Sequence, residues 1–217
     1  MNLLILDCDF DRSRETNGSW LLKRIADSCG ASTRIYRAFG PHMLKGFEGY
    51  DRVIITGSNA SVYEHRNWIA RLAGAIRDID MAGIRTLGIC FGHQAVASAL
   101  GGVVEKGCGE QGFKSIRMTK EGINDPLFGG LSNDFIAYQS HNDYVKSLPR
   151  GSVVLASNSS CVQSFRLRNI YGVQFHPEIS RDVAERMYRR DNKPILFEGV
   201  PDHYRLPEKL VRSFISD

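Results

Sequence analysis

Residues 87–94 read LGICFGHQ, and this stretch decides the fold. The apolar run from Thr86 to Ile89 predicts a short buried strand, and the alanine-rich stretch that ends at Leu100 predicts a helix. Cys90 lies between them, with a glycine two residues before it and another two residues after it, which is the pattern of a nucleophile elbow. The glycines leave room for the strained backbone that such a sharp turn forces on the nucleophile. The alternative is an ordinary buried cysteine, because cysteine is often buried.

The predicted position of Cys90 has chemical consequences. The N-terminus of a helix carries a partial positive charge, which favours a thiolate over a thiol. The free backbone N–H groups of the first helical turn can also receive an oxyanion. The motif therefore predicts a cysteine nucleophile with an oxyanion site beside it.

The residues before this motif alternate apolar runs with amphipathic stretches. Trp68, Leu72, Ile76 and Ile79 recur at helical spacing and define one face of a helix that ends at Gly83. Strands that alternate with helices predict an α/β fold with a mostly parallel sheet and helices on both faces. The other elements expected in this half are strands at 3–6, 33–38 and 53–55 and a helix around 20–26 that ends near Gly30.

The second half has closely spaced strand-like runs separated by turn residues. Short connections between strands favour antiparallel neighbours, so we expect an antiparallel extension of the sheet in a single domain. The core of that domain would cover residues 1–180, and a helical tail would cover 181–217. The expected strands are 113–118, 135–139, 153–157, 161–167 and 170–175, and the expected helices of the tail are 180–190 and 208–214, with an irregular proline-containing segment between them.

A second candidate motif, YGVQFHPE, occupies residues 171–178. Residues i and i+2 of an extended chain lie on one face, so His176 and Glu178 can meet. A carboxylate beside an imidazole fixes its tautomer and stabilises the imidazolium. Alone, this stretch reads as an ordinary strand-end turn. Together with Cys90, however, it supplies nucleophile, base and orienting carboxylate, all at the carboxyl ends of predicted strands, where open α/β sheets bind their ligands.

Composition excludes several classes of protein. The chain has 217 residues, of which 42% are hydrophobic and 24% charged, as in ordinary globular proteins. The net charge of +4 is spread along the chain and predicts no nucleic-acid partner. We find no signal peptide and no apolar run long enough to span a membrane. Five cysteines without CxxC spacing predict neither a disulfide framework nor a metal site, and they favour the reducing cytosol.

The paired motifs LGICFGHQ and YGVQFHPE resemble those of the class I (triad-type) glutamine amidotransferase family, over about residues 3–179. The resemblance implies a flavodoxin-like fold and no cofactor. It also implies that Cys90 attacks the γ-amide of L-glutamine, that ammonia leaves, and that water hydrolyses the γ-glutamyl thioester. His176 would serve as base and then acid, with Glu178 as its partner.

The same resemblance implies further site residues. The oxyanion hole would use the backbone N–H of Phe91 and a second donor in the loop of Gly57 and Ser58, where the family usually has a second glycine and then proline. Gln94 would contact the substrate. The backbone of a short segment would hold the α-amino and α-carboxylate groups of the substrate, and that segment is Ser140-His141-Asn142.

Four other features have less specific interpretations. We expect His93 to pack in the core, and we assign Cys8 no role. The glycine-rich stretch from Gly107 to Gly112 reads as a loop near the pocket that could serve as a lid, and Cys108 reads as an exposed, oxidisable cysteine or simply a residue of that loop.

The resemblance leaves three functions open. The first is a glutaminase subunit that feeds ammonia to a separate synthetase, since residues 140–149 (SHNDYVKSLP) resemble the glutaminase part of GMP synthase. The second is a stand-alone enzyme that hydrolyses glutamine, γ-glutamyl peptides or other γ-glutamyl amides, which the Gly57-Ser58-Asn59-Ala60-Ser61-Val62-Tyr63 stretch favours. The third, a non-catalytic binding module, is disfavoured because it needs no intact Cys-His-Glu set.

Overall fold

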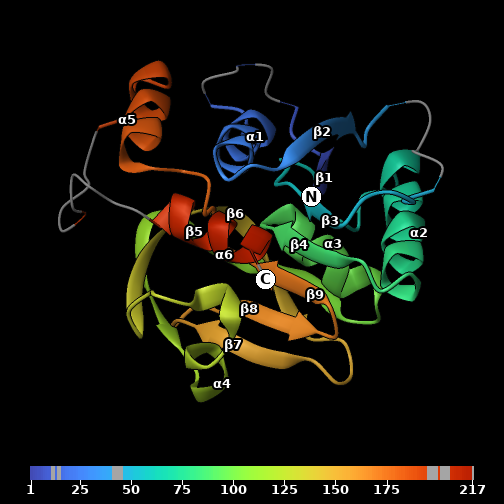
Figure 1. Ribbon diagram of the computed structural model, residues 1–217. Helices are drawn as coiled ribbons and strands as arrows, with labels where there is room; N and C mark the ends of the chain where they lie inside the picture. The colour runs from blue at the N-terminus through green and yellow to red at the C-terminus, as the bar shows by residue number, and fades with distance from the viewer. Residues whose placement is uncertain (11–12, 14–15, 41–45, 195–199, 201–205, 217) are drawn as a thin grey trace.

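The computed structural model describes all of the chain except residues 11–12, 14–15, 41–45, 195–199, 201–205 and 217 (Figure 1). The strands are β1 (Asn2–Asp7), β2 (Ser32–Arg37), β3 (Arg52–Ile55), β4 (Arg85–Ile89), β5 (Val103–Met118), β6 (Asp134–Ser147), β7 (Val153–Ser157), β8 (Val162–Leu167) and β9 (Ile170–Val173). The helices are α1 (Gly18–Ser28), α2 (Asn67–Met81), α3 (Phe91–Ala99), α4 (Lys120–Ile123), α5 (Arg181–Arg190) and α6 (Leu206–Ser216), with a short 3₁₀ helix, η1 (Pro126–Phe128). None of the helices described is long and apolar enough to cross a membrane.

The strands form one sheet in the order β2-β1-β3-β4-β9-β8-β7-β5-β6. From β2 to β9 the neighbours are parallel, and from β9 to β6 they are antiparallel. This confirms the predicted α/β fold with a parallel sheet and an antiparallel extension. The chain enters β9 only after all the antiparallel strands, so two segments far apart in sequence, β4 and β9, end side by side at the same edge.

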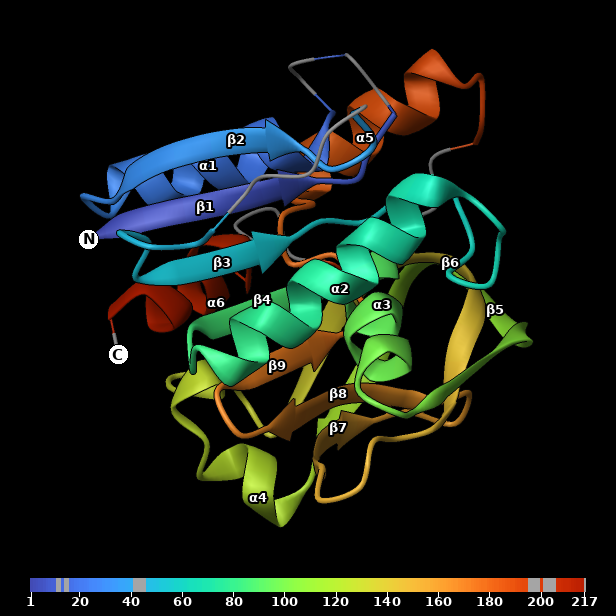
Figure 2. The same cartoon turned by 90° about the vertical axis from the view of Figure 1, so that its right-hand side faces the viewer.

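Alternating residues of β1 divide the core between the two faces of the parallel sheet. Leu3 and Ile5 pack in one apolar cluster with residues of α1 and α6, and Leu4 and Leu6 pack in another with residues of α2 and α3. All four side chains are fully buried, as expected for a strand covered on both faces. Figure 2 shows α2 and α3 in front of the sheet and α1 and α6 behind it.

Helix α5 covers the edge of the sheet where the parallel strands end (Figure 2). Its first turn is capped by Ser180, whose side chain accepts a hydrogen bond from the N–H of Val183. Val183 and Ala184 are buried in a third apolar cluster with Tyr138 and Ile179. This packing holds α5 beside the ends of β6 and β9.

The prediction of a loop from Gly107 to Gly112 is wrong, because these residues lie inside β5. The strand pairs with β6 along its length, and its register shifts between Lys106 and Glu110. Three residues of this stretch have a positive φ, with values of 138° at Gly107, 51° at Cys108 and 82° at Gly112. The glycines correctly indicated irregular backbone here, but the irregularity is a β-bulge in a paired strand and not a loop.

The predicted irregular segment between α5 and α6 falls largely outside the described residues. Elsewhere the expected elements are confirmed with shifts of one to a few residues at their ends, except that β5 and β6 extend well beyond the expected 113–118 and 135–139.

The close backbone packing at the elbow between β4 and α3 requires glycine at two positions. A Cβ on Gly88 would lie 2.5 Å from the carbonyl oxygen of Gly92, and a Cβ on Gly92 would lie 2.2 Å from the carbonyl oxygen of Ile55. Cys90 itself has φ of 51° and ψ of −103°, a conformation that costs free energy for a residue with a side chain. The close backbone packing therefore stabilises a strained residue at the tip of the turn.

Replacing Gly92 with alanine should lower the free energy of unfolding by about 3 kcal/mol, because the added methyl group meets backbone rather than a movable side chain. Gly74→Ala is the matched control: nothing lies within 4 Å of a Cβ at this position inside α2, so that variant should be as stable as the parent or more stable. Urea denaturation of the three proteins measures the difference. Equal stability of Gly92→Ala and the parent would contradict this packing.

Candidate active site

Cys90 occupies the N-cap position of α3, directly after β4. Its backbone N–H donates to the carbonyl oxygen of Val173 in β9 at 2.8 Å, which ties the elbow to the neighbouring strand. Its Sγ lies 3.6 Å from the carbonyl oxygen of Ser140 in β6. The side chain is thus held between the parallel sheet and the antiparallel extension, at the N-terminus of a helix.

His176 and Glu178 lie just beyond the end of β9. The N–H of His176 donates to the carbonyl oxygen of Tyr138 at 2.8 Å, so β6 fixes the backbone of the histidine. His176 Nδ1 lies 2.8 Å from Glu178 Oε1, as the i and i+2 spacing predicted. Gly18, the first residue of α1, leaves room for this carboxylate, because a Cβ there would lie 3.2 Å from Oε1.

Opposing effects act on the pKa of His176. Burial by itself would lower the pKa of this imidazole, but the carboxylate of Glu178 and the thiol of Cys90 act against burial and raise the pKa well above its ordinary value. The two neighbours therefore favour the imidazolium form over the neutral ring. A cationic ring between a cysteine and a carboxylate stabilises a thiolate and holds a proton ready for transfer.

The loop after β3 brings Gly57 against both members of the pair. A Cβ on Gly57 would lie 3.0 Å from Cε1 of His176 and 3.7 Å from Cβ of Cys90. Ser58 follows in the same loop, and Phe91 opens the first turn of α3, where backbone N–H groups have no partner within the helix. The structure thus brings together the residues that the sequence suggested for an oxyanion hole.

Asp143 of β6 holds the far end of the Gly57 loop. Its carboxylate accepts hydrogen bonds from Ser61 Oγ at 2.5 Å and from Tyr63 OH at 3.0 Å, and its carbonyl oxygen accepts one from Gln94 Nε2 at 2.9 Å. One buried residue therefore links this loop, the elbow helix and β6. The sequence offered no signal for this role, because the three segments are far apart in the chain.

Two cavities meet at Cys90. One, which we call the α5 cavity, has a volume of about 550 Å³. The other, the β6 cavity, has a volume of about 450 Å³. Both are lined by Ser58, Asn59, Cys90, Gln111 and Ser140. A larger hollow between α1 and β2 contains none of the predicted site residues.

Each cavity is also lined by residues that the other cavity lacks. Gly57, His176 and Glu178 line only the α5 cavity, together with Ile179 and Met187, Tyr188, Arg190, Asp191 and Lys193 from α5 and the residues after it. Gln94, His141 and Asn142 line only the β6 cavity, together with Ala60, Ser61, Tyr63, Lys106, Gly109, Glu110 and Asp143. The sequence analysis named Ser58, Cys90 and Ser140 of the shared lining and Gln94, His141 and Asn142 of the β6 cavity, but it gave no sign that α5 contributes to the site.

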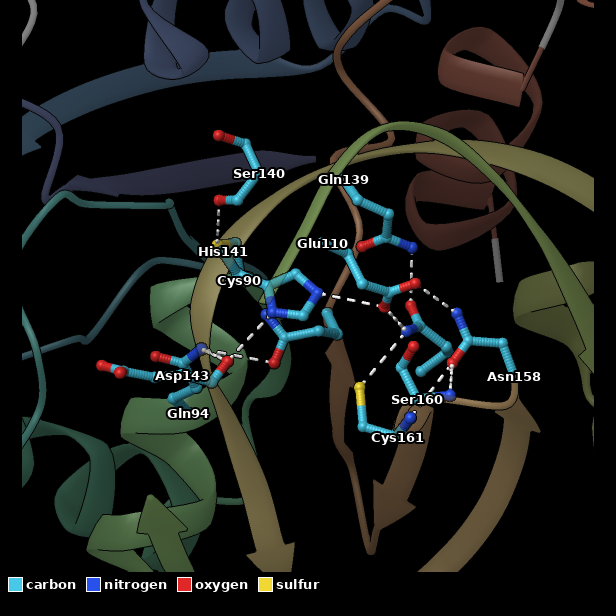
Figure 3. A network of polar contacts seen from close by, with 12 residues as sticks. Cys90, Gln94, Glu110, Gln139, Ser140, His141, Asp143, Asn158, Ser160 and Cys161 are labelled. Atoms are coloured by element: carbon cyan, nitrogen blue, oxygen red, sulfur yellow. Dashed lines mark hydrogen bonds and ion pairs between the residues drawn. The ribbon is translucent and has the colours of Figure 1, made fainter. Parts of the chain in front are cut away.

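Figure 3 shows a buried polar network behind the β6 cavity. Nδ1 of His141 lies 3.1 Å from the carbonyl oxygen of Asp143, and Nε2 lies 3.3 Å from Glu110 Oε2. Burial by itself would raise the pKa of Glu110, but hydrogen bonds from His141 and Asn158 and the charge of His141 lower it below its ordinary value.

Glu110, His141 and Cys161 are also a possible set of metal ligands, with their ligand atoms within 4.8 Å of one another. They come from β5, β6 and the turn before β8, which are far apart in the chain, so sequence spacing could not reveal them. The amide nitrogen of Gln163 donates to both Glu110 Oε2 at 2.8 Å and Cys161 Sγ at 3.3 Å. Because this amide donates where a cation would need acceptors, the cluster fits a hydrogen-bond network better than a metal site.

His93 packs in the core as predicted. It is fully buried, and its ring centroid lies 5.0 Å from that of Phe165. Cys8 is fully buried after β1, and Cys108 is exposed.

Residues 16–193 match the model of the glutamine amidotransferase class-I family, and the chain belongs to that family. A glutamine amidotransferase from Thermotoga maritima has the same fold, with a TM-score of 0.82 over 99% of this chain and 96% of that chain at 20% identity.

Two curated relatives carry more specific names. A GMP synthase [glutamine-hydrolyzing] from Pyrobaculum aerophilum is 43% identical over 133 residues, which are 58% of this chain and 24% of that protein. A gamma-glutamyl-L-1-hydroxyisopropylamide hydrolase from a Pseudomonas species is 31% identical over 157 residues, 65% of this chain and 51% of that enzyme. The matched part thus spans about a quarter of the first relative and about half of the second.

Removing the charge of Glu110 should destabilise the protein. Glu110→Gln keeps the shape but leaves the buried His141 without its anionic partner, so the free energy of unfolding at pH 7 should fall by about 2 kcal/mol. Glu105→Gln, which breaks an exposed ion pair with Lys146 on the same two strands, is the control and should stay close to the parent. Equal stability of both variants in urea would show that the buried pair contributes nothing.

His93 should make stability depend on pH. Burial lowers the pKa of His93 to about 3, so the folded protein keeps the ring neutral while the unfolded chain protonates it near pH 6.5. The unfolded state then binds more protons between these values, and stability falls as the pH falls. Between pH 7 and pH 5 this group alone should cost about 2 kcal/mol.

The matched variant is His93→Leu, which removes the titrating ring from the same buried position. Its urea-denaturation stability should fall less between pH 7 and pH 5 than that of the parent, by about the same 2 kcal/mol. Parallel pH profiles for the two proteins would refute this assignment.

Proposed function

We propose that the protein hydrolyses the γ-amide bond of a γ-glutamyl amide, of which L-glutamine is the simplest, through a thioester on Cys90. The observation that carries the proposal is the meeting of Cys90, at a strained helix N-terminus, with a histidine whose Nδ1 is 2.8 Å from Glu178. The substrate, L-glutamine or another γ-glutamyl compound, would bind without a cofactor. The whole chain would act as one module, with the tail contributing α5 to the site.

The reaction follows from the positions of these groups. The thiolate of Cys90 attacks the γ-carbonyl carbon, and the backbone N–H groups of Phe91 and Ser58 stabilise the oxyanion. The imidazolium of His176 gives its proton to the leaving nitrogen, so the C–N bond breaks and the amine or ammonia leaves. Neutral His176 then takes a proton from water, whose oxygen attacks the thioester; the C–S bond breaks, glutamate leaves, and the Cys90 thiolate is regenerated beside the His176 imidazolium. Glu178 holds the ring and its charge throughout.

The β6 cavity is the proposed place for the glutamyl part. Gln94 and the segment Ser140-His141-Asn142 line this cavity, with the Ser140 carbonyl oxygen 3.6 Å from the Cys90 sulfur. The amide nitrogen of Gln94 already donates to Asp143 and Gln174. We therefore propose that the amide nitrogen of Gln94 stabilises the wall of the β6 cavity. The substrate contacts would come mainly from the backbone of Ser140-His141-Asn142.

A second candidate function is a glutaminase subunit that supplies ammonia to a separate synthetase. It is supported by the similarity to the relative named GMP synthase. In that case glutamine hydrolysis would depend on the partner. Co-purification with a synthetase, together with stimulation of glutamate release by it, would favour this function.

Glutamate release by the purified protein tests the proposed chemistry. Cys90→Ala should abolish release and His176→Ala should reduce it by at least about 10³-fold, whereas Glu178→Gln should cost less because the carboxylate supports the histidine. Cys108→Ser is the control for an exposed cysteine and should retain activity. Release by a folded Cys90→Ala variant at the rate of the parent would exclude the mechanism.

A further inference from the structure

The α5 cavity is much larger than ammonia requires. An ammonia molecule occupies about the volume of one water, roughly 30 Å³, while this cavity holds about 550 Å³, within the usual range for small-molecule sites. We infer that the α5 cavity binds the amine part of the substrate, and that the preferred substrates are γ-glutamyl amides whose nitrogen carries a small aliphatic group. This inference rests on the proposed function and specifies the substrate of the same site.

The direction of the leaving group follows from the four substituents of the tetrahedral intermediate. One is the sulfur of Cys90, and a second is the oxyanion, which faces the N–H groups of Phe91 and Ser58. The leaving nitrogen has to face the acid that protonates it, and His176 lines the α5 cavity but not the β6 cavity. The remaining substituent, the glutamyl chain, then extends into the β6 cavity, and anything attached to the nitrogen extends toward α5.

The wall that this group would meet carries both apolar and charged side chains. Ile179, Met187 and Tyr188 supply apolar surface. In the same wall, Arg190 pairs with Asp191 at 2.9 Å and donates to Thr16 Oγ1 at 3.1 Å, so the two charges of this pair largely compensate each other. Asp9 and Lys193 also line this cavity, so a small aliphatic substituent would make its apolar contacts with Ile179, Met187 and Tyr188.

Helix α5 belongs to the fold itself and closes this side of the site. Its buried residues Val183 and Ala184 share an apolar cluster with Tyr138 and Ile179, and Arg181 donates to the carbonyl oxygen of Val200 at 2.6 Å. An ammonia route to a partner would need an exit on the side where His176 releases ammonia. The chain instead places its own helix there, which favours a substrate pocket over a partner interface.

Glutamate release from two substrates tests the inference. With the full chain, kcat/KM for γ-L-glutamyl-n-propylamide should exceed that for L-glutamine by at least about tenfold, because a single methylene in an apolar pocket can already give discrimination of this size. Cys90→Ala should release glutamate from neither substrate. Release from glutamine but not from the propylamide would overturn the inference and leave the proposed function standing. Release from neither by the folded parent would contradict both.

A variant that fills the cavity supplies the second test. Met187→Trp should lower the ratio of kcat/KM for the propylamide to kcat/KM for glutamine by at least about tenfold, because the indole takes the space of the propyl group. Arg186→Trp adds the same side chain to the exposed side of α5, outside the cavity lining, and should keep the ratio of the parent. An unchanged ratio in a folded Met187→Trp variant would overturn the inference.

Discussion

The close packing of backbone around Cys90 is the constraint on which the rest of the site depends. Gly92 lies against the carbonyl of Ile55 at the end of β3, and the N–H of Cys90 is bonded to Val173 at the end of β9. Three neighbouring strands thus hold one residue at a positive φ. This conformation is strained, and the packing and hydrogen bonding of the surrounding strands hold the turn in it.

The other parts of the site lie at the same edge of the sheet as Cys90. Because β9 lies beside β4, His176 and Glu178 emerge next to the elbow, and the loop after β3 places Gly57 between the cysteine and the histidine. The antiparallel strand β6 then passes on the other side of Cys90 and supplies Ser140 and Asp143. One edge therefore provides the nucleophile, the proton carrier and the walls of two cavities.

The sequence was most informative where function and local backbone coincide. The glycines around Cys90 and the HPE stretch at 176–178 predicted the elbow and the His176–Glu178 pair, because each depends on neighbours within a few residues. It failed where contacts are long-range: nothing local marked α5 as a wall of the site or Asp143 as the anchor of the Gly57 loop. The bulged strand around Cys108 was mistaken for a loop, because glycine marks irregular backbone without saying whether a partner strand pairs with it.

Covalent labelling with a chloromethyl ketone analogue of glutamine tests the central claim most directly, because it asks which cysteine is the nucleophile. Cys90 is 4% exposed, whereas Cys108 is exposed. A reagent that reacted by accessibility would therefore label Cys108. We expect one adduct per chain, on Cys90, with labelling slowed by a competing γ-glutamyl amide and lost in His176→Ala. Adducts on Cys108 with Cys90 unmodified, measured by peptide mass spectrometry, would contradict it.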